Sequence, residues 1–169
     1  MKWSSAVTFL LLFMCCTVEA ESGLYASFSA SRFSVLTDWE YGATPGFYYD
    51  HWRMHRIHAG VDLRAQLLGS GTEKLQGGLI GPRIVLDRFV AGLKPYGEGL
   101  IGGSHVTLVE RESDIENNSF EFELVLGVDR NVSPRVDWRL AEISWGKVTS
   151  AGPPFALTTV STGLVFRFP

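Results

Sequence analysis

The sequence predicts an all-β fold: an eight-stranded antiparallel up-and-down transmembrane β-barrel. Strict alternation over residues 57–67 is the first observation, since every odd position is apolar and every even one is polar, charged or glycine. Successive side chains on a strand point to opposite faces, so this segment has one apolar and one polar face. The same alternation returns over residues 120–128 and, more weakly, near both ends of the chain.

Residues 1–20 are interpreted as a signal peptide. Lys2 supplies a positive start, residues 7–16 form a short apolar stretch, and Val18-Glu19-Ala20 resembles a small-residue cleavage site. The apolar stretch is far shorter than the roughly 20 residues of a membrane helix. Cleavage after Ala20 leaves residues 21–169 as one barrel domain.

Both cysteines, Cys15 and Cys16, lie in the predicted signal. A lipid-modified cysteine is disfavoured, because bulky Phe13 and Met14 stand where small residues are expected. A secreted domain without disulfides must be held by its core or by a membrane. The net charge of −3 gives no sign of nucleic-acid binding.

Eight strands account for the rest of the chain. The second has Tyr41, Ala43, Pro45, Phe47 and Tyr49 on one face, the fourth is glycine-rich and least regular, and the eighth ends close to the last residue. The expected ranges, in order, are 23–30, 39–49, 55–68, 75–86, 93–103, 119–129, 135–145 and 155–168.

The connectors alternate in length. Short ones are expected at 50–54, 87–92 and 130–134, and the longest, 104–118, is polar and acidic. If both chain ends lie on one side, this long connector falls on the other side. Short inner turns with longer outer loops are typical of outer-membrane barrels, whose strands need about 9–11 residues to cross.

Alternation alone does not decide whether the apolar face of the strands lies outside or inside the barrel. A membrane barrel has this face outside, whereas a soluble barrel has it inside. Aromatic residues at the expected strand ends favour the membrane, since aromatic girdles mark the two bilayer interfaces. The interfacial aromatics are Tyr49, Trp52 and Phe168 near one rim, and Trp39, Tyr41 and Trp145 near the other.

The polar face is predicted to form a charge network that fills the lumen. Eight strands leave room for little more than side chains, and opposite charges there can pair. The predicted lumen residues are Asp62, Arg64, Glu98, Glu121, Glu123, Asp137, Arg139 and Arg167.

Histidines are the main candidates for chemistry. His51, His55 and His58 cluster near one turn, and His105 follows Ser104 in the long connector. The first three are interpreted as a polar turn at the membrane rim rather than a metal site. No catalytic, metal or cofactor-binding residue is assigned, and no enzyme activity is expected.

Four segments give the sequence a resemblance to a known family. These are Gly60-Val61-Asp62-Leu63-Arg64, residues 93–100, residues 135–139 and residues 162–168. Together they resemble the small bacterial outer-membrane barrels related to outer membrane protein A, of the porin-family type. The resemblance implies a Gram-negative outer-membrane location, contact with outer-membrane lipid and insertion by the barrel-assembly machinery. Family members usually end on an aromatic residue, whereas here Pro169 follows Phe168.

The leading hypothesis is therefore an outer-membrane barrel with a plugged polar lumen. Its role is structural, or an interaction at the cell surface through the outer loops with a partner that the sequence does not identify. One alternative is a soluble periplasmic or secreted barrel that binds a ligand, although the Gly-x-Trp of lipocalin-type barrels is absent before Trp39. The other is a lipid A-modifying enzyme, although His105 does not fit the His-x-Ser pattern of lipid A deacylases.

Overall fold

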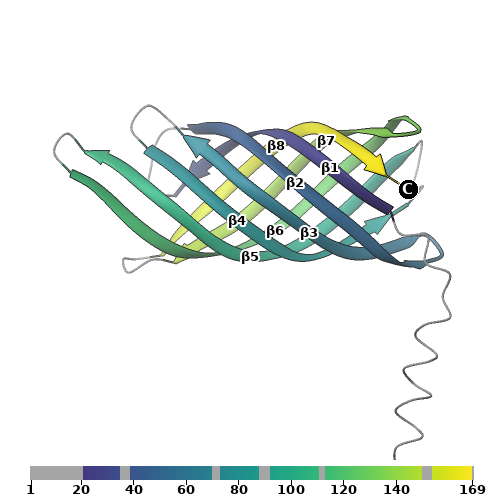
Figure 1. The fold of residues 1–169 in the computed structure, drawn as a ribbon, viewed down its shortest axis with the longest axis horizontal. Coiled ribbons are helices and arrows are strands. Elements are labelled where there is room, and N and C mark those ends of the chain that lie inside the picture. Colours follow the sequence, from purple (N-terminus) through teal and green to yellow (C-terminus); the bar gives the residue numbers. More distant parts are fainter. Residues whose placement is uncertain are drawn as a thin grey trace, which may run out of the picture.

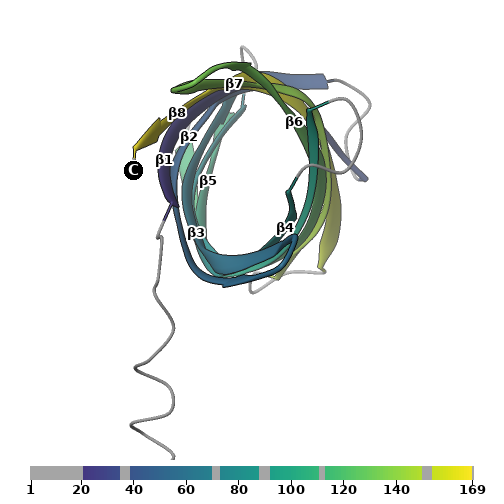
Figure 2. The same ribbon diagram turned by 90° about the vertical axis from the view of Figure 1, so that its right-hand side faces the viewer.

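The barrel is closed, and its strands follow one another around it in chain order (Figures 1 and 2). The computed structural model describes residues 21–34, 39–69, 73–87, 92–110, 113–149 and 154–168. The strands are β1 (Glu21–Phe33), β2 (Trp39–Met54), β3 (Ile57–Gly69), β4 (Glu73–Leu86), β5 (Leu93–Glu110), β6 (Ser113–Ser133), β7 (Val136–Thr149) and β8 (Phe155–Phe168). Each strand pairs antiparallel with its neighbours, and β1 pairs with β8. The predicted eight-stranded antiparallel barrel is confirmed, while the predicted signal peptide lies outside the described residues.

The two ends of the barrel differ. Glu21 and Phe168 lie at one end, here called the terminal end, together with the turns that join β2 to β3, β4 to β5 and β6 to β7. The opposite end is called the hairpin end, because the hairpin of β5 and β6 projects there beyond the other strands (Figure 1).

The predicted long connector over 104–118 is wrong. β5 and β6 continue through it, and their ladder runs from Ser104 opposite Ser119 to Glu110 opposite Ser113. In sequence, residues 110–118 are polar or charged except for Ile115, so this part lacks the apolar period by which a membrane strand is recognised. Backbone pairing between the two strands does not need that period, because a hairpin in water can be polar on both sides.

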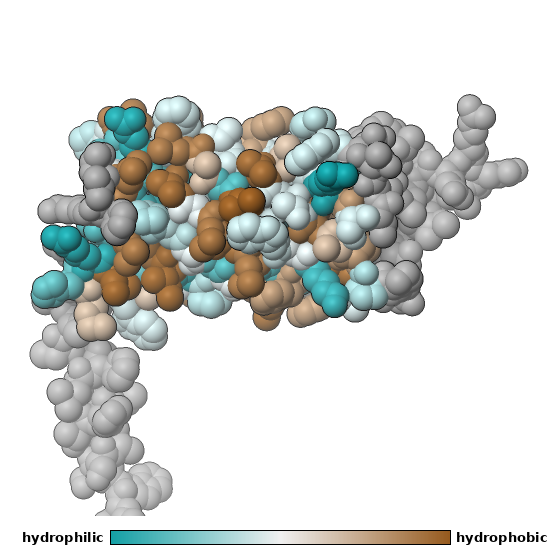
Figure 3. Space-filling model, turned by 180° about the vertical axis from the view of Figure 1, so that it is seen from behind, coloured by the Kyte–Doolittle hydropathy of each residue, from teal (hydrophilic) through white to brown (hydrophobic). Residues whose placement is uncertain are grey.

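Apolar side chains cover the outer wall of the barrel. Leu63, Ile84, Leu124, Leu126 and Phe166 are all about half exposed, and apolar residues gather on the side of the barrel between more polar ends (Figure 3). Polar and charged residues on the alternate positions are buried inside. This arrangement is the reverse of a soluble barrel and matches the facing of a membrane barrel. Among the described residues, no helix is long and apolar enough to cross a membrane.

A bulge in β7 reverses its alternation. The register shifts between Arg139 and Glu142, which are both buried although they are three residues apart. As a result Trp138 and Trp145 both face outward, although an odd separation of seven residues would place them on opposite faces of a regular strand.

An apolar cluster lies inside the barrel near the hairpin end. Phe33, Leu68, Leu75 and Leu157 are buried together, and Phe155 packs against Phe33 with ring centroids 5.6 Å apart. Next to this cluster, toward the terminal end, hydroxyl groups pair across β8, β1 and β2: Ser29 Oγ lies 2.7 Å from Thr44 Oγ1 and 3.1 Å from Ser161 Oγ.

Candidate functional site

The candidate site is a charged plug in the lumen, and Arg64 lies at its centre. Its Nε is 3.1 Å from Asp62 Oδ1 on the same strand, and its Nη1 donates to Glu142 Oε1 on β7 at 3.0 Å. Its Nη2 also donates to Glu98 on β5. One side chain thus joins strands on opposite sides of the barrel.

Two further arginines extend the plug. Arg83 pairs with Glu98, lies 3.4 Å from Asp129 Oδ2 through Nη2, and has Nε 3.9 Å from Asp50 Oδ1. Arg139 places Nε 3.1 Å from Asp129 Oδ1 and Nη1 3.1 Å from Glu142 Oε2. Each of Glu98, Asp129 and Glu142 therefore joins two arginines, and the three cations form one continuous network.

Three tyrosines pack around these arginines. The Arg83 guanidinium lies over the rings of Tyr48 and Tyr96, at 4.5 and 4.1 Å from their centroids. Arg139 lies over Tyr25 at 4.1 Å and over Tyr96 at 4.9 Å. Such contacts between a cation and an aromatic face strengthen when both groups are removed from water. The tyrosines also donate to the network, because Tyr25 Oη donates to Asp62 Oδ1 at 2.8 Å and Tyr96 Oη to Glu142 Oε2 at 2.6 Å.

Each tyrosine ring lies over a glycine of the neighbouring strand. The pairs are Tyr25 with Gly46, Tyr48 with Gly23, and Tyr96 with Gly127, and each pair is directly opposite in the ladder. A side chain on any of these glycines would occupy the position of the ring. The glycines therefore let the rings lie flat against the barrel wall and face the arginines.

We predict that Gly127→Ala destabilises the folded barrel by about 1–3 kcal/mol, the usual range for overpacking. The added methyl would displace the Tyr96 ring, which contacts Arg83 and Arg139 and donates to Glu142. Gly78→Ala is the matched control, because nothing lies within 4 Å of its added Cβ. Urea unfolding in lipid vesicles measures both variants, and equal stability would contradict the packing role of Gly127.

Between the arginines and the apolar cluster the lumen is acidic. Glu123 accepts hydrogen bonds from Ser144 Oγ and, at 3.0 Å, from Gln66 Nε2. Glu121 is fully buried, and neither of its carboxylate oxygens has a hydrogen-bond partner among the described residues. The pairing that was expected between opposite charges in the lumen thus does not include Glu121 among the described residues.

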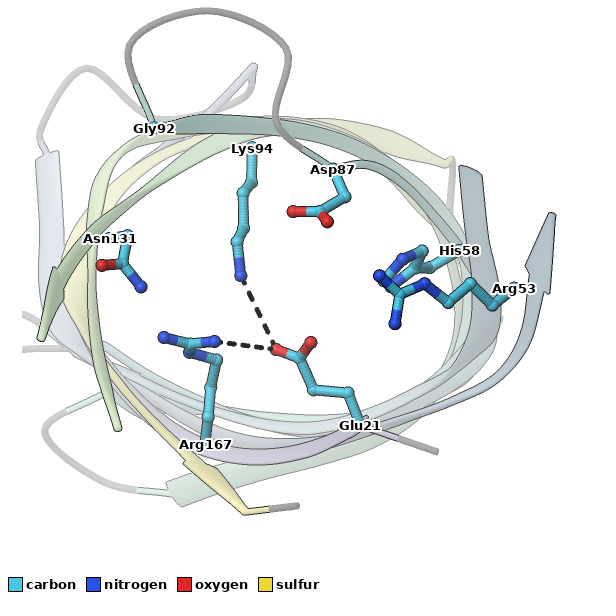
Figure 4. Close-up of a pocket in the computed structure, with 8 residues that line it drawn as sticks. All are labelled: Glu21, Arg53, His58, Asp87, Gly92, Lys94, Asn131 and Arg167. Atoms are coloured by element: carbon cyan, nitrogen blue, oxygen red, sulfur yellow. Dashed lines mark ion pairs between the residues drawn. The ribbon is translucent and has the colours of Figure 1, made fainter. Parts of the chain in front are cut away.

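A vestibule of about 480 Å³ opens at the terminal end (Figure 4). It is lined by Glu21, Arg53, His58, Asp87, Gly92, Lys94, Asn131 and Arg167. Glu21 Oε1 lies 3.7 Å from Lys94 Nζ and 3.6 Å from Arg167 Nη1, as drawn in Figure 4. Asp137 completes this group, with Oδ2 3.2 Å from Lys94 Nζ and 3.0 Å from Arg167 Nε.

All eight residues that were predicted to face the lumen lie inside the barrel. Asp62, Arg64, Glu98 and Arg139 belong to the arginine network, Glu121 and Glu123 to the acidic layer, and Asp137 and Arg167 to the vestibule. Sequence reasoning missed Asp50, Arg83, Asp129, Glu142 and the three tyrosines. Glu142 was hidden by the β7 bulge, and Tyr48 would have been found from its alternation with Phe47 and Tyr49.

The six aromatics that were predicted to be interfacial are exposed on the outer wall. Trp39, Tyr41 and Trp145 lie in the hairpin-end halves of their strands, and Tyr49, Trp52 and Phe168 lie toward the terminal end. Tyr41 also stacks on Phe28, with centroids 6.2 Å apart.

The histidines are not brought together. His51 is exposed and stacks on Tyr49, His55 occupies the β2–β3 turn with φ of 60°, and His58 is buried at the vestibule. Within the described ranges, no group of three or more His, Cys, Asp or Glu side chains is placed to hold a metal. Ser104 faces the lumen, and the next residue of the strand, His105, points to the opposite face, so the two do not form a nucleophile–base pair.

No family model matches the sequence, and no curated protein matches it. Solved structures do match. The chain has the fold of the small outer-membrane barrels. Neisserial surface protein A matches with a TM-score of 0.56 and 16% identity, over 88% of this chain and 97% of that one.

Two other solved structures of outer-membrane barrels also match this chain. Ail, the attachment invasion locus protein of Yersinia pestis, solved with the heparin analogue sucrose octasulfate, matches with a TM-score of 0.59 and 14% identity, over 89% of this chain and 99% of that one. The outer-membrane enzyme PagL matches with a TM-score of 0.50 and 17% identity, over 86% of this chain and 99% of that one. At sequence identities this low, the structural similarity shows the fold of this chain and not its function.

Proposed function

We propose that the protein is an integral outer-membrane barrel with a plugged lumen and a non-catalytic role at the cell surface, exerted through the hairpin end. The observation that carries the proposal is the combination of an apolar outer wall with a lumen crossed by buried ion pairs. Leu124 on the wall is 51% exposed, while its neighbour Glu123 is 1% exposed inside. Such a wall needs lipid around it, and such a lumen does not conduct.

Among the described residues, the β5–β6 hairpin projects farthest at the hairpin end and is the main candidate to contact a partner. These two strands have 18 and 21 residues, against 13 to 16 for the others, and the extra length lies at the hairpin end. In sequence this extension contains Glu110, Glu112, Asp114 and Glu116 with only Arg111 to balance them. An acidic sequence of this kind suits a cationic partner rather than a polyanion such as the heparin analogue bound by Ail.

Cysteine labelling tests this placement, because residues 21–169 contain no cysteine. We expect a membrane-impermeant maleimide to label Glu110→Cys, at the end of β5, on intact cells. Arg56→Cys, in the β2–β3 turn, should be labelled only after the outer membrane is permeabilised. Labelling of Arg56→Cys alone on intact cells would reverse the orientation, and recovery of both variants as water-soluble protein would overturn the proposal.

A further inference from the structure

A second hollow lies on the outside of the barrel, at the terminal end of β8. It has a volume of about 430 Å³ and is lined by Leu24, Arg135, Phe166, Arg167 and Phe168. Leu24 is directly opposite Phe166 in the β1–β8 ladder, and both side chains are exposed on the outer wall. Leu24, Phe166 and Phe168 thus give the hollow apolar walls on the face that the proposed function places in lipid.

Arg135 adds a cation to this apolar hollow. It stands in the β6–β7 turn, its carbonyl accepts from the Arg167 backbone N–H at 2.8 Å, and its own N–H donates to Ser133 Oγ at 3.4 Å. These bonds fix the Arg135 backbone beside the end of β8, while its side chain is exposed. A guanidinium at the edge of an apolar hollow suits an amphiphile with a phosphate group, because Arg can bind phosphate through two parallel hydrogen bonds.

Charge on the surrounding rim favours an anionic ligand. Arg56 and Arg130 are exposed at the same end of the barrel as Arg135. The carboxylates described near this end point inward instead, since Asp50, Asp129 and Asp137 are buried, and Glu21 and Asp87 line the vestibule. Basic groups next to a membrane attract anionic headgroups.

We propose that this hollow binds one anionic phospholipid of the inner leaflet. An acyl chain lies between Leu24, Phe166 and Phe168, and the phosphate rests on the Arg135 guanidinium. The inference rests on the proposed function, which places the outer wall in lipid and the terminal end at the inner leaflet.

Native mass spectrometry tests the site on the folded, detergent-solubilised barrel. The probes are phosphatidylglycerol and phosphatidylcholine with identical acyl chains, titrated separately. We expect one phosphatidylglycerol to be retained, and Arg135→Gln to weaken that retention by about tenfold, as for loss of a hydrogen bond to a charged group. Leu24→Trp, which fills the hollow and keeps the charge, should weaken binding of both lipids.

Arg56→Gln is the matched control, because it removes the same charge from the same rim outside the hollow and should leave retention unchanged. Equal losses in Arg135→Gln and Arg56→Gln would show general attraction to the rim and overturn the site. Absence of retained lipid in the unmodified barrel, or retention that Leu24→Trp does not change, would also overturn it. Failure of the proposed function is seen separately, as a chain that folds in buffer without detergent.

Discussion

Replacing Arg139 with Met is expected to destabilise the barrel by about 3–5 kcal/mol, the usual cost of removing one partner from a buried ion pair. Arg139 is fully buried between the rings of Tyr25 and Tyr96 and pairs with Asp129 and Glu142. Met fills a similar volume, so the main loss is electrostatic. Among the described residues, Asp129 would keep Arg83 as its cation, and Glu142 would keep Arg64 and the Tyr96 hydroxyl.

The measurement is a urea unfolding titration in lipid vesicles, followed by tryptophan fluorescence. Arg56→Met makes the same chemical change at an exposed turn and should alter the unfolding free energy by no more than about 0.5 kcal/mol. The double variant Arg139→Met/Glu142→Gln should be less destabilised than the sum of the two single variants, because it also removes one of the uncompensated charges. Additive single effects would mean that the two residues do not interact as the structure shows.

The sequence predicts the fold well because alternation in a barrel strand has only two outcomes for each residue, inward or outward. Residues 57–67 follow the alternation without interruption, residues 120–128 depart from it only at inward-facing Val125, and the strands there lie where it predicts them. The prediction fails where the period is interrupted or absent. The β7 bulge shifts Glu142 into phase with Arg139, and over residues 110–118 of the β5–β6 extension the sequence has Ile115 as its single apolar residue.

The site is less predictable, because its geometry depends on contacts across the lumen. That Arg64 lies inward follows from its place between Leu63 and Ala65, whereas its pairing with Glu142, 78 residues away, depends on the tilt and closure of the barrel. Tyr25, Tyr48 and Tyr96 were missed for a different reason. Aromatic residues in a membrane barrel are expected at the lipid interface, and the glycines that make room for these rings lie on neighbouring strands.

Leu124→Arg is expected to cost about 2–4 kcal/mol, the range for a cation on the lipid face near the bilayer midplane. Leu124 is exposed on the outer wall, opposite Trp145 in the ladder with β7. Val132→Arg makes a similar change on the same face of the same strand, but near its end at the barrel rim. There the cost should fall to about 0–1 kcal/mol, because an arginine at the interface reaches water.

Glu123→Gln provides the comparison on the other face. The variant keeps one acceptor oxygen for Ser144 or Gln66, so we expect it to cost less than Leu124→Arg in the same vesicle titration. A soluble barrel would show a different order, because arginine at an exposed position in water changes stability little. Equal and mild effects at Leu124 and Val132 would therefore mean that water, and not lipid, covers the outer wall. A cost that depends on depth at these two positions would instead require a bilayer around the barrel.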